Sequence, residues 1–103
     1  TLSDFGRTLK PAAGSAPGSD HAWGNHQLVL GGGEHGGRIH GTFPTLALAG
    51  PNDSGSEGRW IPTTSIEQYG AALATWFGAV PADLDYVFPN RGRFAAPPPL
   101  MMA

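Results

Sequence analysis

The feature that most constrains this chain is its content of glycine and proline, which together supply 26 of the 103 residues (16 and 10). Such a share reaches the edge of the low-complexity range. The apolar residues are nevertheless grouped along the chain, and three tryptophans argue against simple disorder. The length suits one domain with a modest core.

The clearest predicted element is a helix between Thr64 and Phe77. Thr64-Ser65-Ile66-Glu67 matches a capping box, in which the Thr64 hydroxyl accepts from the Glu67 amide. Apolar residues then recur at helical spacing and predict a face that belongs to the core rather than to a cofactor site: Ile66, Tyr69, Leu73, Trp76 and Phe77. Gly78 stands where the helix is expected to stop.

A short second helix is predicted from Pro81 to Val87, because proline is favoured in a first turn. Leu84, Val87 and Phe88 would pack inward, and Pro89-Asn90 would end the helix. The proline-rich residues 95–103 are expected to form an extended or disordered tail.

Extended structure is predicted before these helices. The apolar run Gln27–Leu30, bounded by three glycines, suits a short buried strand. Arg38–Gly41 suits a strand or hairpin arm. Thr42–Leu48 is predicted to be an edge strand or an extended segment, because Pro44 argues against a central strand.

The polar segment Gly50–Gly58 predicts an exposed, mobile turn region. Trp60 follows it and is predicted to be a packing residue rather than a sugar platform. Gly31-Gly32-Gly33 does not match a phosphate-binding loop, so we assign it no nucleotide role.

The stretch from Gly18 to His26 carries the candidate chemistry. It holds Asp20, His21 and His26 between glycines, and Asp4 lies a short way upstream. With no cysteine present, carboxylate oxygen and neutral imidazole are the ligands left for an ion such as Zn²⁺. The alternatives are that the loop residues are simply polar surface, and that Asp4 caps a turn.

Arg7 is a candidate for binding an anionic group through its guanidinium fork, or else for pairing with Asp4. His35 and His40 flank a glycine-rich turn, and their spacing is weak evidence for a metal site.

The net charge of −2 provides no basic surface, so nucleic acid is not expected as a partner. There is no apolar run long enough to span a membrane, and the absence of cysteine does not decide the compartment. Thr1-Leu2-Ser3-Asp4 has the pattern of a strand already in progress. We therefore expect a C-terminal piece of a larger protein, whose structure should contain either further chains or extensive exposed apolar surface.

Four motifs in order carry a family resemblance: SDFGRT, GSDHAWGNHQLVLGGGEHGGRIHGTFPTLAL, GRWIPTTSIEQYGAALATWFG and DLDYVFPNRGRF. Together they resemble the C-terminal end of the DUF1501 proteins, a bacterial family placed in the alkaline phosphatase and sulfatase superfamily. The resemblance implies an α/β fold: residues 1–94 would be the last portion of an alkaline-phosphatase-like three-layer α/β/α sandwich, with residues 95–103 as the tail.

The resemblance also implies a metal-dependent hydrolase of phosphate or sulfate esters, exported to the periplasm or cell exterior. Its Ser or Thr nucleophile would lie upstream of this chain, and its divalent metal would be Zn²⁺ or a similar ion. His21 would be a metal ligand, Asp20 a second ligand or the carboxylate that orients His21, and His26 and Asp4 further candidates. Arg7 would contact the substrate, and the upstream part of the same domain would be the partner.

One position departs from the superfamily pattern. An Asp-His pair often follows this strand, whereas here Asp4 is followed by Phe5. The departure favours an alternative function: a non-catalytic envelope or assembly-associated protein that retains the fold without a complete active site.

Overall fold

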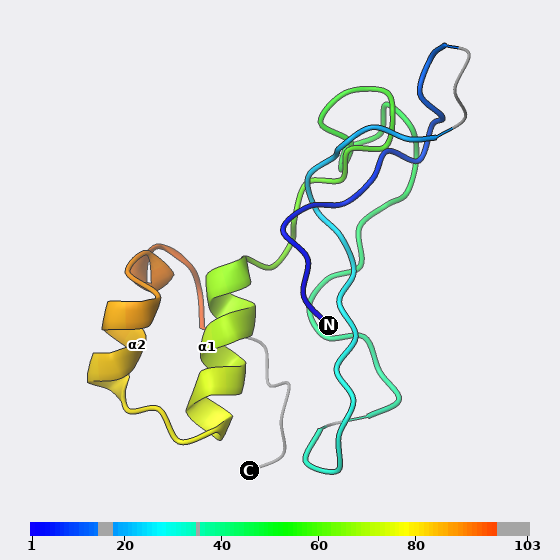
Figure 1. The fold of residues 1–103 in the computed structure, drawn as a ribbon. Helices are drawn as coiled ribbons and strands as arrows, with labels where there is room; N and C mark the ends of the chain where they lie inside the picture. Colours follow the sequence, from blue (N-terminus) through cyan, green and yellow to red (C-terminus); the bar gives the residue numbers. More distant parts are fainter. Residues whose placement is uncertain (15–17, 35, 97–103) are drawn as a thin grey trace. The chain divides into compact units, whose positions relative to one another are not determined.

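The computed structural model describes residues 1–14, 18–34 and 36–96. The chain divides into two compact units (Figure 1). The first comprises Thr1–Leu28 with Phe43–Thr63, and the second comprises Val29–Thr42 with Thr64–Ala103.

Helix α1, Ile66–Trp76, is present as predicted, but its cap differs by one residue. Ser65 is the N-cap, its hydroxyl accepts from the Gln68 amide, and the Gln68 side chain accepts from the Ser65 amide. The predicted box from Thr64 to Glu67 is therefore wrong. Both tetrapeptides fit the capping-box pattern, and the sequence alone did not separate the two registers. Gly78 adopts a positive φ of 101° just beyond the helix, which confirms the predicted stop.

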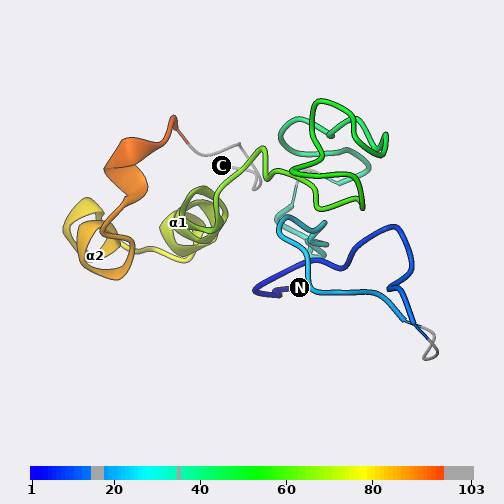
Figure 2. The same cartoon turned by 90° about the horizontal axis from the view of Figure 1, so that it is seen from above.

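Helix α2, Pro81–Val87, confirms the second predicted helix, and proline opens it. It runs antiparallel beside α1 (Figures 1 and 2). Gly70 admits the close contact, because a Cβ at this position would lie 2.6 Å from the Phe88 ring. The 3₁₀ helix η1, Arg91–Arg93, follows and was not predicted.

The apolar face predicted for α1 is not the buried face. Ala71 of α1 and Leu84 of α2 are the buried apolar residues of the pair. Phe77 is 87% exposed and Ile66 57%, and Val87, expected to pack inward, is 60% exposed. Helix α2 approaches α1 at Gly70, and Tyr69 and Leu73 of the predicted face are half-buried, whereas Ile66, Trp76 and Phe77 stay exposed. This confirms the expectation of exposed apolar surface.

The first unit is built on extended backbone joined by isolated bridges, Arg7↔His21 and Asp53↔Trp60. No continuous strand occurs among residues 1–14, 18–34 and 36–96. The predicted strand at Gln27–Leu30 is therefore wrong, and Leu30 is 90% exposed. Within the described residues, the backbone of Leu28 bonds to Thr1, whereas a strand needs a partner along its length. The sandwich architecture itself stays a proposal.

The segment Gly50–Gly58, predicted to be an exposed turn region, is exposed at Pro51 and at residues 54–56, but it folds around a buried side chain. Asp53 is only 9% exposed and Gly58 is buried. Trp60, directly after the loop, is 8% exposed and confirms its predicted packing role. No helix in the described part of the chain is both long and apolar enough to cross a membrane.

Candidate functional site

Arg7 and His21 stand directly opposite each other in an antiparallel bridge. Backbone hydrogen bonds hold the two segments in register on both sides of the pair. The Gly6 amide donates to Trp23 O (2.9 Å), and the Thr8 amide donates to Asp20 O (3.0 Å). Residues opposed in this way project their side chains to the same face. The structure therefore places Arg7 and His21, which are 14 residues apart in the sequence, on one face.

Phe5 completes this face. Its ring stacks on the His21 imidazole with centroids 4.2 Å apart, and the Arg7 guanidinium carbon lies 5.5 Å from the Phe5 centroid. One N–H of Arg7 donates to Ser19 O at 3.0 Å. The aromatic contact and this hydrogen bond fix the orientation of two exposed polar groups. We call Phe5, Arg7 and His21 the hairpin face.

The other predicted site residues do not join the hairpin face. Asp20 contributes through its backbone, whose amide donates to Thr8 Oγ1 at 3.0 Å. His26 stacks on Phe43, with centroids 4.9 Å apart. Asp4 is exposed, and no Arg7–Asp4 ion pair occurs among the described residues.

Metal ligation was predicted for His21, Asp20, Asp4 and His26. In the described ranges, no three side chains of His, Asp or Glu gather as a ligand set. Asp20 and His21 are adjacent in extended backbone, so their side chains point to opposite sides. The structure thus offers His21 as a single imidazole rather than as part of a chelating pair.

A second polar contact lies in the other unit. His40 Nε2 and Glu34 Oε1 are 3.0 Å apart, and both side chains are largely buried (13% and 9% exposed). This pair was not predicted, since sequence spacing gave no reason to join the two. His35, the other weak candidate, lies outside the described residues.

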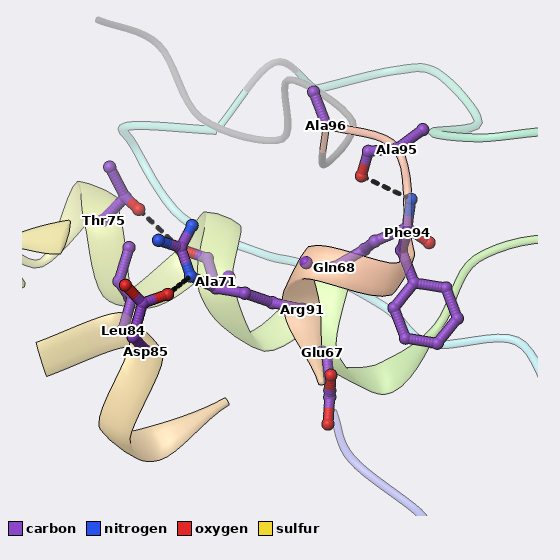
Figure 3. A pocket seen from close by; sticks show the side chains of 11 residues that line it. Glu67, Gln68, Ala71, Thr75, Leu84, Asp85, Arg91, Phe94, Ala95 and Ala96 are labelled. Carbon is purple, nitrogen blue, oxygen red and sulfur yellow. Dashed lines mark hydrogen bonds and ion pairs between the residues drawn. The ribbon is translucent and has the colours of Figure 1, made fainter. Parts of the chain in front are cut away.

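A hollow of about 290 Å³ lies beside α1, α2 and η1 (Figure 3). Arg91 donates to Asp85 Oδ1 at 2.7 Å along its wall. Glu67 Oε1 accepts from Asn90 at 3.1 Å, which is the contact Glu67 makes instead of capping the helix. Charged groups line this hollow, and among the described residues Glu67 Oε2 is buried there without a hydrogen-bond partner.

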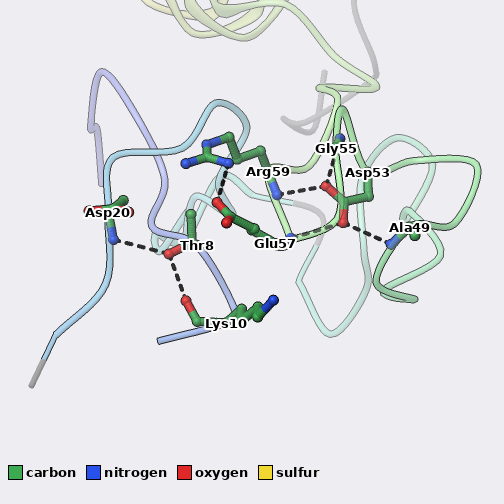
Figure 4. Close-up of polar contacts among 9 residues, drawn as sticks. Thr8, Lys10, Asp20, Ala49, Asp53, Gly55, Glu57 and Arg59 are labelled. Atoms are coloured by element: carbon green, nitrogen blue, oxygen red, sulfur yellow. Dashed lines mark hydrogen bonds and ion pairs between the residues drawn. The ribbon is translucent and has the colours of Figure 1, made fainter. Parts of the chain in front are cut away.

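The most heavily hydrogen-bonded side chain is Asp53, which the sequence did not single out (Figure 4). Burial raises the pKa of this carboxyl group, but four backbone N–H donors outweigh burial and hold the pKa below its ordinary value. Asp53 is therefore a buried anion at neutral pH. The signal in the sequence was an aspartate followed closely by glycines, which is typical of a side chain that closes a turn.

The family model for "Protein of unknown function (DUF1501)" matches residues 1–57. That range is more than half of the chain and includes SDFGRT and GSDHAWGNH. The chain belongs to the DUF1501 family. No curated protein and no solved structure matches it.

The matched range contains the hairpin face and Asp53, so both lie in the part of the chain that defines its DUF1501 membership. The two helices lie beyond this range. All of the hairpin face thus lies both in the first unit and in the range that matches the family.

Proposed function

We propose that this DUF1501 chain supplies an oxyanion-binding face, formed by Arg7 and His21, to a metal-dependent hydrolase of phosphate or sulfate esters. The observation that supports this best is the direct opposition of Arg7 and His21 in an antiparallel bridge. A guanidinium presents a planar fork of donors that matches phosphate or sulfate oxygens. An imidazole donates to the same group when protonated, or ligates a metal when neutral.

The proposed fold is the last portion of an alkaline-phosphatase-like α/β/α sandwich, formed by residues 1–94. This rests on the resemblance of the sequence motifs to that superfamily. The many exposed apolar side chains support it, because such faces are normally covered by another layer of secondary structure. Export to the periplasm or cell exterior is part of the proposal and rests on the resemblance alone.

The proposed metal needs ligands from elsewhere in the protein. A zinc ion takes at least three protein ligands, and the described residues do not gather three. They do not by themselves fit the ion, so we derive no step through it. Within this chain, the proposal assigns oxyanion binding to Arg7, keeps His21 as the best candidate ligand, and gives Asp20, Asp4 and His26 no defined role.

A non-catalytic DUF1501 protein that kept the fold is the second candidate. One contact favours it: the Phe5 ring covers one face of the His21 imidazole. The superfamily pattern often has a histidine at the position of Phe5. Phenylalanine at this position replaces a polar side chain with a ring that packs against His21.

Hydrolysis of aryl phosphate and aryl sulfate esters by the intact protein separates the two candidates. The enzyme proposal expects turnover by the wild type and a kcat/KM about tenfold lower for Arg7→Gln, as befits the loss of a charge-assisted contact at an exposed position. Arg38→Gln removes an exposed guanidinium outside the hairpin face and serves as the matched control. Absence of turnover with every ester would support the non-catalytic candidate.

The proposed role of His21 as a metal ligand is tested by a separate measurement. Elemental analysis of the intact protein should give a lower metal content for His21→Ala than for the wild type, since an imidazole ligand is lost. His40→Gln removes an imidazole that already pairs with Glu34 and should leave the metal content unchanged. Equal metal content in all three proteins would exclude His21 as a ligand.

A further inference from the structure

Asp53 accepts four backbone hydrogen bonds, which is as many as a carboxylate can take (Figure 4). Oδ1 accepts from the amides of Gly55 (3.1 Å) and Arg59 (3.0 Å). Oδ2 accepts from the amides of Ala49 (3.0 Å) and Gly58 (2.9 Å). One side chain thereby closes the backbone from residue 49 to residue 59.

The backbone of this loop adopts conformations that need such support. Ala49 has a positive φ of 56°, which is uncommon for a residue other than glycine, and Gly58 has a φ of 79°. Ser54 and Ile61 add two bonds across the loop, to Arg59 O (2.9 Å) and Asn52 O (2.8 Å). The loop is thus held in a single shape around the Asp53 carboxylate.

Two carbonyl groups, one of Glu57 in this loop and one of Trp60 directly after it, bind the two segments that carry the hairpin face. Glu57 O accepts from the Lys10 amide at 3.0 Å, three residues after Arg7. Trp60 O accepts from the Gly24 amide at 2.8 Å, three residues after His21. The loop and the residue after it therefore hold both segments, each three residues beyond the residue that contributes to the hairpin face.

A hydroxyl group ties the same segments together between these points. Thr8 Oγ1 donates to Lys10 O at 2.9 Å and accepts from the Asp20 amide at 3.0 Å, and Thr8 is buried (Figure 4). Thr8 follows Arg7 and Asp20 precedes His21. The hydrogen-bonded chain from Asp53 thus passes through Glu57 and Lys10 to the residues beside the hairpin face.

We propose that Asp53 is the positioning residue of the oxyanion site: it sets the separation of Arg7 and His21 through the carbonyls of Glu57 and Trp60. This rests on the proposed function, since it takes the hairpin face as a site for phosphate or sulfate groups. Asp53 does not contact the anion. Its negative charge is stabilised by the four backbone donors.

The experiment measures binding of inorganic phosphate to the intact protein by isothermal titration calorimetry. Asp53→Asn replaces an acceptor oxygen by an amide that points N–H groups at backbone donors, so the loop must open. We expect phosphate binding about tenfold weaker, as is typical when a group that orients a ligand-binding side chain is removed. Glu57→Gln removes a carboxylate from the same loop, keeps its backbone carbonyl, and should bind phosphate like the wild type.

A second variant disturbs the contact between the loop and the hairpin by a steric clash instead of by the loss of hydrogen bonds. Gly58→Ala would place a Cβ 2.5 Å from Leu9 Cβ, at a positive φ, and so pushes the loop away from the hairpin. It should weaken phosphate binding as Asp53→Asn does. Phosphate affinity within twofold of the wild type in both variants, or an equal loss in Glu57→Gln, would overturn the positioning role.

Amide exchange separates failure of this inference from failure of the proposed function. In Asp53→Asn, the Lys10 and Gly24 amides should exchange faster, because their acceptors lie in or directly after the loop that opens. If the wild type binds no phosphate but these amides still respond, the oxyanion proposal fails while the positioning of the hairpin stands. If they do not respond, Asp53 does not position the hairpin.

Discussion

Substitution of Gly6 by alanine is the sharpest stability test of the hairpin. Gly6 is buried, and a Cβ at this position would lie 2.2 Å from the carbonyl oxygen of Gly24. A carbon–oxygen contact needs about 3.3 Å, so the two segments must separate by about 1 Å. The glycine of SDFGRT is therefore required for the close approach of two backbones.

The cost follows from the bonds that the separation breaks. The Gly6 amide donates to Trp23 O (2.9 Å), and the Ala22 amide donates to Gly6 O (2.8 Å). Lengthened by that amount, neither is a hydrogen bond. Each contributes about 1 kcal/mol, and the lower freedom of alanine in the unfolded chain offsets about 0.5 kcal/mol. We expect a net loss of about 1.5 kcal/mol.

Native-state hydrogen exchange of the intact protein is the assay. Protection of the Ala22 amide should fall about tenfold in Gly6→Ala, the equivalent of the expected loss. Gly18→Ala lies at the far end of the same hairpin, where a Cβ meets no atom of the described residues within 4 Å, and should leave this protection unchanged. Wild-type protection in Gly6→Ala, or an equal fall in Gly18→Ala, would refute the reasoning.

The remaining predictions concern the loop and the helices. Asp53→Asn should be less stable to urea than the wild type at neutral pH. Because the folded-state pKa of Asp53 is lowered, the contribution of its carboxylate to folding stability is complete above the ordinary value of 3.8. The stability difference between wild type and variant should therefore vanish as the pH falls through the folded-state pKa. Gly70→Ala should destabilise the α1–α2 contact despite a gain of about 1 kcal/mol in helix propensity, because its Cβ would meet the Phe88 ring at 2.6 Å; increased amide protection in α1 would contradict this. Ser65→Ala should cost about 1 kcal/mol of helix stability, and Thr64→Ala well under half of that. Amide exchange in the first turn of α1 measures both losses. A larger loss in Thr64→Ala than in Ser65→Ala would show that Thr64 is the N-cap.

The two helices were predictable because their signals are local. Helical periodicity, a proline at the first turn of α2 and Gly78 after α1 all act within a few residues of where they stand. The cap was misplaced because adjacent residues satisfy the same pattern. Which face of α1 is buried depended on the approach of α2 at Gly70 and Ala71, and periodicity carries no information about that approach.

The candidate site was predictable in its residue types and not in its geometry. Arg7 and His21 were both singled out, but their opposition depends on the register of a pairing that spans 14 residues. The strand at Gln27–Leu30 failed for a related reason, since an apolar run does not specify a partner. Asp53 was missed because its donors come together only when the loop folds.

The most direct test of the central claim is a phosphate titration of the intact protein followed by NMR of the Arg7 guanidinium and the histidine rings. An oxyanion site on the hairpin face predicts saturable shifts of the Arg7 Nε–H and His21 ring signals, with the His40 ring, which pairs with Glu34, unchanged. Shifts that do not saturate, or that are equal at His21 and His40, would contradict the claim.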